Sequence, residues 1–282
     1  MEGPYRLDSE TTVRLGAFLC VFAAMALWEV LAPRRPLALG RSRRWPNNIG
    51  VAVLNAALLR TLLPAAAIAI AGIGELEGWG VFNNLPFWLD AYLPWGAMVP
   101  SVILLDLAIY LQHVMFHAVP ALWRIHRMHH ADLDFDVTTG ARFHPLEIII
   151  SMIVKIGAVA VIGAPPEAVL IFEIALNGTA MFNHGNVRLP AAADRALRWV
   201  LVTPDMHRVH HSVERAETNS NFGFNLSWWD RCLGTYRAQP RAGHLGMTIG
   251  LDQFRDPAEL RLGRMLVQPW RGGAGAYPLG RG

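Results

Sequence analysis

Apolar runs long enough to cross a lipid bilayer constrain the fold of this chain more than any other feature. The first extends over about residues 15–32 and the second over 49–74, while the third begins near Trp95 and continues through Leu111. A helix of about 20 apolar residues spans a hydrocarbon layer of roughly 30 Å. Composition agrees, since 53% of residues are hydrophobic and only 17% are charged. The sequence therefore predicts an all-α integral membrane protein.

Two shorter apolar runs follow, over residues 146–163 and 167–182, and the segment between them is Ala164-Pro165-Pro166. Two runs joined by a short proline-containing turn are typical of an antiparallel helical hairpin. We therefore expect about four transmembrane helices, namely three single spans plus a hairpin that counts as one or two.

The arginines predict which way the chain crosses the membrane. Five of them lie between residues 34 and 44, whereas residues 75–94 contain no basic residue. Short loops rich in arginine stay in the cytoplasm. We therefore expect an external N-terminus and an external loop at 75–94. The single lysine among many arginines, alanines and glycines favours a bacterial source, and thus the inner membrane.

Charged residues within the apolar runs need partners or an interface. A lone arginine at bilayer depth costs on the order of 3 kcal/mol, so Arg60 is expected to face protein rather than lipid. Lys155 can pair with a carboxylate such as Glu173, which predicts a structural role. The net charge of +3 comes from arginines at the ends of apolar runs, which does not indicate a nucleic-acid partner.

Histidine is concentrated in the second half of the chain, where ten of the eleven histidines lie between residues 113 and 211. Three tight clusters account for eight of them: His113-x-x-x-His117, His126-x-x-His129-His130 and His207-x-x-His210-His211. A ninth, His184, stands in Asn183-His184-Gly185-Asn186. Neutral imidazole is the commonest metal ligand, and residues three or four apart share one face of a helix. The pattern predicts a metal site beside the membrane.

Nine imidazoles are too many for one ion, because a catalytic zinc takes three protein ligands and a structural zinc takes four. Two ions with four or five ligands each would use them. All-nitrogen ligation with open positions suits iron, although affinity alone favours copper or zinc in some settings. A carboxylate-bridged pair would need Glu-x-x-His motifs, which the sequence lacks. A bis-imidazole haem, a proton relay, a metal-transport path and a structural zinc site remain alternatives.

Three further residues outside these clusters could contribute to a metal site or lie apart from it. Asp106 lies seven residues before His113, on the same helical face, where a carboxylate could orient a ligating histidine. His144 is a candidate ligand, a support for a ligand, or a contact at the start of a helix. His244 stands alone in the polar C-terminal part and is expected to be unrelated to the site.

The motifs taken together resemble the fatty acid hydroxylase superfamily, which includes the sterol desaturases. The resemblance rests on Asp106-x-x-x-Tyr110-x-x-His113-x-x-x-His117, on Leu122-Trp123-x-x-His126-x-x-His129-His130, on His144-Pro145-x-Glu147, on Asn183-His184-x-Asn186, on His207-Arg208-x-His210-His211-Ser212, and on Asn221-Phe222-Gly223 with Trp229-Asp230-Arg231-Cys232-Leu233-Gly234-Thr235-Tyr236. It covers about residues 40–265.

The resemblance implies one membrane di-iron oxygenase domain over residues 1–265, with a catalytic core at about 95–237 and a cytosolic helical cap rich in histidine. The Gly- and Pro-rich tail at 266–282 is expected to be disordered. The implied metal ligands are His113, His117, His126, His129, His130, His184, His207, His210 and His211. Supporting residues would be Asp106, Tyr110, His144, Glu147, Asn183 and Asp230, with no catalytic residue beyond the metal centre. Some members have a second histidine about four residues from the position of His184, where this chain has Ala180 and Arg188.

The implied activity is hydroxylation of an unactivated C–H bond, or desaturation, with two iron ions and O2 as co-substrate. The substrate would be a membrane lipid such as a sterol, a fatty acyl chain, an ether lipid or an aminolipid. No dinucleotide or iron–sulfur motif is present, which predicts no bound flavin or nicotinamide and an external electron donor (a ferredoxin, cytochrome or reductase). A metal or proton transporter and a binuclear zinc hydrolase are the rival functions. The sequence leaves the substrate and the oligomeric state open.

Overall fold

The computed structural model describes residues 7–63, 66–85 and 95–279. The first six residues of the predicted external N-terminus, residues 64–65 of the second apolar run, residues 86–94 of the predicted external loop and the last three residues of the tail lie outside these ranges. Within them every regular element is a helix, and β-pairing is limited to isolated bridges. The predicted all-α class is confirmed.

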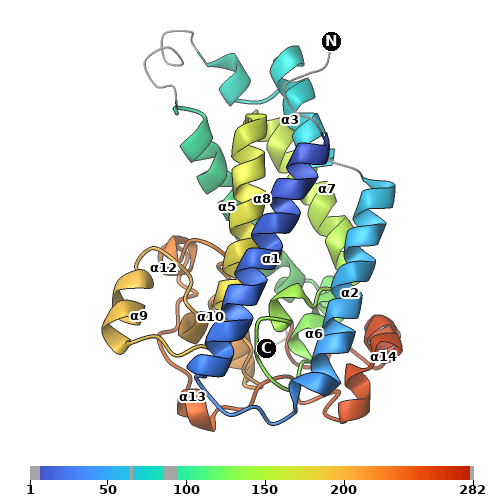
Figure 1. Ribbon diagram of the computed structural model, residues 1–282, viewed down its shortest axis with the longest axis vertical. Coiled ribbons are helices and arrows are strands. Elements are labelled where there is room, and N and C mark those ends of the chain that lie inside the picture. The colour runs from blue at the N-terminus through green and yellow to red at the C-terminus, as the bar shows by residue number, and fades with distance from the viewer. Residues whose placement is uncertain (1–6, 64–65, 86–94, 280–282) are drawn as a thin grey trace.

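Long helices form an elongated bundle (Figure 1). They are α1 (Leu7–Leu31), α2 (Arg41–Leu62), α3 (Ala66–Glu77), α5 (Met98–Ala118), α7 (Pro145–Ile162) and α8 (Pro166–Asn183). Four stretches of the described chain are long and apolar enough to cross a membrane: Thr11–Leu31, Arg41–Asn84, Met98–Ala118 and Pro145–Ile162. The chain is an integral membrane protein with the number of spans that the sequence predicts.

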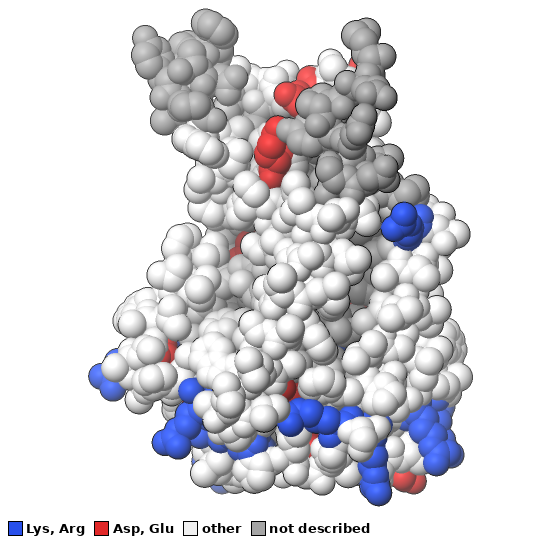
Figure 2. Space-filling model, viewed as in Figure 1, with Lys and Arg blue, Asp and Glu red and all other residues white. Residues whose placement is uncertain are grey.

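Short helices form a cap at one end of the bundle (Figure 1). They are α6 (Pro120–His130), α9 (Ala191–Leu197), α10 (Pro204–His210), α11 (Arg215–Thr218), α12 (Trp228–Cys232), α13 (Gly243–Gly246) and α14 (Leu262–Val267), with the 3-10 turns η2 (Thr139–Ala141), η3 (Pro257–Leu260) and η4 (Gln268–Trp270). A further turn, η1 (Phe82–Asn84), follows α3. Figure 2 shows arginine side chains gathered at the cap end and acidic side chains nearer the opposite end.

The predicted hairpin is formed by α7 and α8. Gly163 ends α7 with φ of 71°, and a Cβ there would lie 2.8 Å from the carbonyl oxygen of Trp79, so only glycine fits this turn. Pro166 then begins α8 at a position where a missing N–H costs nothing. Side chains of α3, α5, α7 and α8 form one buried apolar cluster that includes Leu105, Val159 and Phe172.

Charged residues within the bundle behave in two ways. Lys155 Nζ donates to Glu173 Oε1 at 2.7 Å, which confirms the predicted pairing, and Arg14 contacts the second oxygen of the same carboxylate. Arg60 lies in the last turn of α2 and is exposed, so the prediction that it faces protein was wrong. A long side chain near a helix end can instead extend its guanidinium toward the interface.

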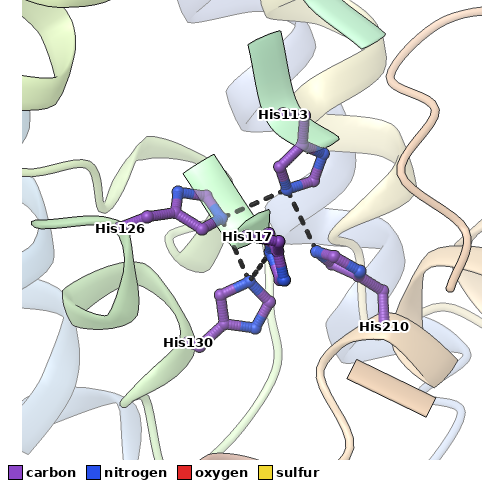
Figure 3. Close-up of side chains that lie close together, drawn as sticks. All are labelled: His113, His117, His126, His130 and His210. Carbon is purple, nitrogen blue, oxygen red and sulfur yellow. Dashed lines mark hydrogen bonds between the residues drawn. The ribbon is translucent and has the colours of Figure 1, made fainter. Parts of the chain in front are cut away.

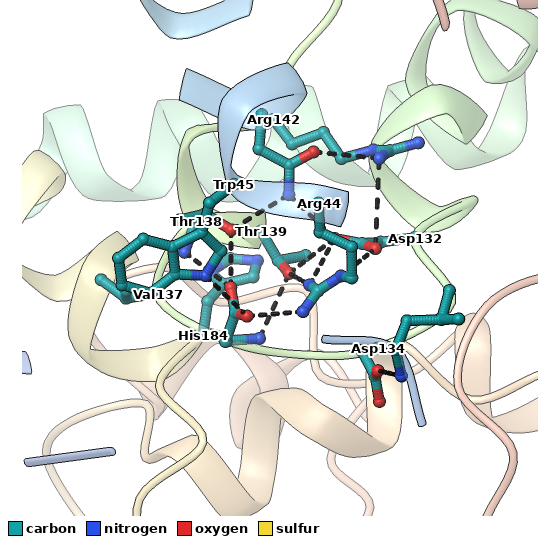
Figure 4. A network of polar contacts seen from close by, with 12 residues as sticks. Arg44, Trp45, Asp132, Asp134, Val137, Thr138, Thr139, Arg142 and His184 are labelled. Atoms are coloured by element: carbon teal, nitrogen blue, oxygen red, sulfur yellow. Dashed lines mark hydrogen bonds and ion pairs between the residues drawn. The ribbon is translucent and has the colours of Figure 1, made fainter. Parts of the chain in front are cut away.

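Arg44 fastens the start of α2 to the segment that follows α6 (Figure 4). Its side chain is fully buried and donates to both oxygens of Asp132, at 2.8 and 2.7 Å, and to Asp136 at 2.5 Å. Burial alone would raise the pKa of Asp132, but Arg44 and Arg142 hold it below its usual value. Asp132 is therefore an anion that needs both guanidinium groups.

The Gly- and Pro-rich tail, which the sequence predicts to be disordered, packs against α5 and α6 as far as Leu279. Arg127 donates to the carbonyl of Gln268 at 2.6 Å and also contacts those of Arg271 and Gly273. Trp123 donates through Nε1 to the carbonyl of Ala274 at 3.0 Å and stacks on Tyr277. Composition suggests disorder when a segment has few groups to bury, whereas this tail supplies carbonyls that buried donors of α6 require.

We expect Arg44→Ala to destabilise the folded protein by about 3–5 kcal/mol, because it removes the cation of Asp136 and one of the two cations of Asp132. Thermal unfolding of the detergent-solubilised protein measures the effect. The control is Arg43→Ala, which removes an exposed arginine one position away and should change stability by less than about 0.5 kcal/mol. Equal melting temperatures for the two variants would contradict the assignment.

Candidate metal centre

The structure brings all nine predicted histidines into two adjacent groups, in which one ligand atom from each residue lies within 4.8 Å of the others. The first group is His113, His117, His126, His130 and His210 (Figure 3). The second group is His129, His184, His207 and His211. All nine are buried, with exposed fractions of 2% or less.

In the first group the Nε2 atoms face one another. His113 Nε2 lies 3.1 Å from Nε2 of both His126 and His210, and His130 Nε2 lies 3.1 Å from that of His126 and 3.2 Å from that of His117. Two nitrogen ligands at right angles, each about 2.1 Å from one metal, are separated by roughly 3.0 Å. The spacing fits a shared ion.

The second group repeats this geometry with four histidines. His184 Nε2 lies 3.1 Å from Nε2 of both His129 and His207. Neither ring nitrogen of His211 has a hydrogen-bond partner, although the residue is fully buried. A buried polar atom without a partner costs free energy, and a metal ion would satisfy it. The donors present therefore fit two ions.

The histidines of each cluster lie within about one turn of a single helix. His113 and His117 lie one turn apart on α5, and α6 carries His126 and His130 on one face with His129 turned toward the second group. On α10, His210 points to the first group, whereas His207, three residues earlier, points to the second. The clusters at residues 126–130 and 207–211 are thus each divided between the two groups, whereas His113 and His117 both belong to the first.

The second ring nitrogen of several histidines is held by the protein. His126 Nδ1 lies 2.7 Å from Oε1 of Glu147, and His184 Nδ1 lies 2.7 Å from the carbonyl of Ala180. Such contacts fix the orientation of a ligating ring, and a carboxylate partner makes it a stronger ligand. Among the supporting candidates, Glu147 is the one whose carboxylate contacts a histidine of the groups.

A loop at residues 219–223 orients three histidines of the first group. His117 Nδ1 lies 3.1 Å from Oδ1 of Asn219, His210 Nδ1 lies 2.7 Å from the carbonyl of Ser220, and His113 Nδ1 lies 2.7 Å from that of Phe222. We call this segment the orienting loop. Sequence reasoning did not single out Asn219 or the carbonyls, since a backbone contact has no residue signature.

Four supporting candidates hold the orienting loop or its continuation rather than a histidine. Asp230 accepts from the backbone N–H of Phe222 and Gly223, Tyr110 contacts Thr235, and Asn183 donates to the carbonyl of Phe224. Asp106 accepts from Trp229 Nε1 at 2.9 Å and from the backbone N–H of Leu226 at 3.1 Å. The expectation that Asp106 orients a histidine directly is corrected, because its carboxylate is taken up by these donors.

The two remaining histidines lie outside both groups. His144 begins α7, where its Nδ1 accepts from the N–H of Leu146, and its Nε2 lies 3.0 Å from the carbonyl of Leu266. This is the helix-start role that the sequence left open for it. His244 lies 3.5 Å from Asp205 in the cap.

The segment between α6 and α7 holds the second group in place. A Cβ at Gly140 would lie 2.6 Å from the carbonyl of Ala180 and 3.2 Å from Nδ1 of His184, so the backbone must pass here without a side chain. The acids Asp132 and Asp136 anchor the same segment to Arg44. Sequence reasoning missed these acids, although the alternation Asp132-x-Asp134-x-Asp136 directly after a histidine pair was a visible signal.

Burial keeps six of these histidines neutral. Burial and neighbouring imidazoles lower the pKa of His129, His130, His207, His210 and His211 well below the usual value, and burial lowers that of His184 to about 3. A metal binds only the neutral ring, so these positions offer lone pairs at neutral pH without first losing a proton.

Comparison with known proteins agrees with these motifs. The family model for fatty acid hydroxylases matches residues 98–235, the segment that contains all nine histidines of the two groups. The chain is 27% identical over 230 residues to an ornithine lipid hydroxylase of Rhizobium tropici, covering 79% of this chain and 67% of that protein. No solved structure matches the chain.

Two further relatives come from animals. The chain is 28% identical over 183 residues to human alkylglycerol monooxygenase, covering 63% of this chain and 38% of that protein. It is 23% identical over 145 residues to cholesterol 25-hydroxylase of Rattus norvegicus, covering 51% of this chain and 48% of that protein. The chain thus spans less than half the length of these two relatives.

We expect the purified protein to bind about two iron ions, and His129→Ala/His211→Ala to bind about one, because two imidazoles are fewer than the three that a metal site normally needs. The first group keeps all its histidines in this variant. Elemental mass spectrometry of anaerobically loaded protein gives the ratio. His144→Ala is the control and should keep about two ions; a double variant that retains both would refute the two-group assignment.

The metal-free protein is expected to lose stability as pH falls below about 6.5, the unperturbed histidine pKa. The folded state lowers these pKa values, so the unfolded chain takes up protons first, and stability is lost from about 6.5 toward the folded value of about 3 given by His184. Melting temperatures of chelator-treated protein between those limits test the sign. A melting temperature that rises as the solution is acidified would be the opposite result.

Proposed function

We propose that the chain, whose residues 98–235 match the family model for fatty acid hydroxylases, hydroxylates an unactivated C–H bond of a membrane lipid with a di-iron centre held by the two histidine groups. One oxygen atom of O2 would enter the C–H bond, and the other would leave as water with two electrons and two protons from a donor. The observation that carries the proposal is the pair of adjacent, fully buried, all-imidazole groups at the end of a membrane-spanning helix.

Bound iron would supply the activation of O2. The chain's own part is to bind and orient the ions. Nε2 of each ring in the first group faces the shared position, and Glu147, Asn219 and the carbonyls of the orienting loop hold the opposite nitrogen of four of the five rings. These contacts fix the tautomer with the lone pair on Nε2. A rigid, pre-oriented ligand set needs no rearrangement when the ions change charge.

The protein also keeps water away from the ions. Four aromatic side chains, each exposed by 1% or less, pack against histidines of one group or the other. They are Trp123, Phe116, Phe135 and Phe222. A dry site protects a reactive oxidant from unproductive reduction and leaves the substrate's C–H bond as its nearest target. This enclosure favours an enzyme over a transport path, since a transporter would need ligands distributed along the depth of the membrane.

The proposed substrate is the alkyl part of a bilayer lipid. An ornithine lipid, an acyl-bearing aminolipid, is the first compound to test, because the relative aligned over 79% of this chain is named for it. Ether lipids and sterols follow from the other relatives. Electrons would come from a separate ferredoxin, cytochrome or reductase. The arginine-rich cap end would face the cytoplasm, in a bacterial inner membrane.

Cells that express the chain are expected to accumulate a lipid carrying one added oxygen atom when grown under isotopically heavy O2. Lipid extracts of cells with and without the chain are compared by mass spectrometry, which gives both the mass increase and the position of the label. The matched control is His129→Ala/His211→Ala, which should abolish the heavy product.

Two other outcomes would refute the proposal. A lipid change that persists without oxygen would indicate a hydrolase using a binuclear zinc centre. Uptake of iron or zinc into vesicles that contain the purified protein, lost in the same double variant, would indicate a transporter.

A further inference from the structure

Two phenylalanine rings together contact both histidine groups. The ring of Phe143 stacks on His129, with centroids 4.3 Å apart and planes 13° from parallel. The ring of Phe224 lies 5.0 Å from that of His113 and 6.1 Å from that of His207. The two phenylalanines face each other at 6.5 Å. Together they cover the line along which the two groups meet.

These two rings differ from the other aromatic side chains packed on the histidines. Phe143 and Phe224 are partly exposed, whereas Phe116, Trp123, Phe135 and Phe222 are exposed by 1% or less. Among the described aromatic residues that contact the groups, this pair alone can be reached from outside without displacing buried structure. The site is therefore accessible on the side where Phe143 and Phe224 lie.

The other sides of the site are closed by fixed structure. On the side of His117, the tail packs Tyr277 over Trp123, and the N–H of Leu279 donates to the carbonyl of His117 at 2.9 Å. The orienting loop covers His113 and His210, and Phe135 covers His184 and His211. Any molecule that approaches on these sides would have to break buried hydrogen bonds or ring contacts.

The remaining side leads to the membrane. Phe224 packs against the buried apolar cluster between α3, α5, α7 and α8, together with Met152 and Leu176. Phe143 precedes His144 and Pro145, where α7 begins and turns into the bilayer-spanning bundle. Both rings therefore stand where the apolar interior of the bundle meets the histidines, and both are hydrocarbon surfaces.

The backbones of the two residues are fixed independently of their rings. The carbonyl of Phe143 accepts from Asn55 Nδ2 at 2.8 Å, and that of Phe224 accepts from Asn183 Nδ2 at 2.9 Å. Neither contact involves the ring. Rotation of a ring about its side-chain bonds can therefore open space beside the histidines while the backbone stays in place, and such rotations are fast.

We propose that Phe143 and Phe224 form the mouth through which an alkyl chain from the bilayer reaches the two histidine groups, and that the size of these two side chains sets which carbon is presented to them. The second part rests on the proposed function. The occupant is a saturated hydrocarbon segment, because the rings offer no hydrogen-bond donor or acceptor and lie at the junction with the apolar cluster.

Photolabelling tests the mouth without requiring activity. The full-length protein is reconstituted into phosphatidylcholine vesicles that contain a phosphatidylcholine with a diazirine in one acyl chain, irradiated, and mapped by peptide mass spectrometry. Adducts on residues 140–145 and 222–226 are normalised to adducts on α1. We expect Phe143→Trp/Phe224→Trp to reduce this ratio about tenfold, because larger rings overfill the mouth. Phe18→Trp on α1 is the matched control and should leave the ratio unchanged.

Small side chains give the complementary result. Phe143→Ala and Phe224→Ala should each raise the labelling ratio, and the metal content of every variant shows whether the histidine groups remain intact. In the heavy-oxygen experiment, Phe224→Ala should move or broaden the labelled position along the chain. A labelling ratio that is the same in the tryptophan, alanine and unchanged proteins, at normal metal content, would overturn the proposal.

The two proposals fail in different ways. Labelling that follows ring size while no lipid acquires heavy oxygen would leave the mouth standing and refute the hydroxylase. A heavy-oxygen product whose position and yield are the same in all the phenylalanine variants, with labelling unaffected, would refute the mouth and leave the hydroxylase standing.

Discussion

The convergence of nine imidazole rings in a buried space is the constraint on which the structure depends. Nε2 atoms that face one another at 3.1 Å cannot all be donor and acceptor to each other, since each neutral ring carries only one N–H and several of those point outward to Glu147, Ala180 or the orienting loop. Protonation would relieve the lone pairs but place charges in a dry interior. Cations at the two centres would resolve the conflict, and the spacing of the rings fits them.

The surroundings of the site follow from this requirement in two layers. The first consists of the orienting loop, Glu147 and the carbonyl of Ala180, which hold the rings from behind. The second holds the first: Asp106 and Asp230 fix the backbone after and within the loop, and Arg44 with Asp132 fixes the connection between α6 and α7. The charged groups of the second layer therefore lie away from the histidines, and they act on them through the backbone.

Sequence reasoning succeeded where the signal was a residue type in a periodic pattern. The apolar runs, the α7–α8 hairpin, the pairing of Lys155 with Glu173 and the gathering of nine histidines all followed from spacing and polarity. The resemblance to a family indicated which residues would bind metal and which would support them. It did not reveal that Asp106 binds a backbone segment, that Arg60 is exposed or that the tail packs on α6. The role of Asp106 depends on the distant backbone N–H of Leu226, and the exposure of Arg60 depends on where α2 ends. The packing of the tail depends on the buried donors of Arg127 and Trp123, which bind its carbonyls.

The distribution of each histidine group along the chain has a consequence for how the protein is made. The first group joins His113 on α5 to His210 on α10, and the second joins His129 to His211, so neither is complete until translation has passed residue 211. The sequences of α5, α7 and α8 precede residue 211, and Leu279, which closes the side of His117, is translated later still. A metal ion would therefore find a complete ligand set only after all of these helices have been synthesised. The order of the chain thus places both ligand sets after the long helices and before the tail that covers His117.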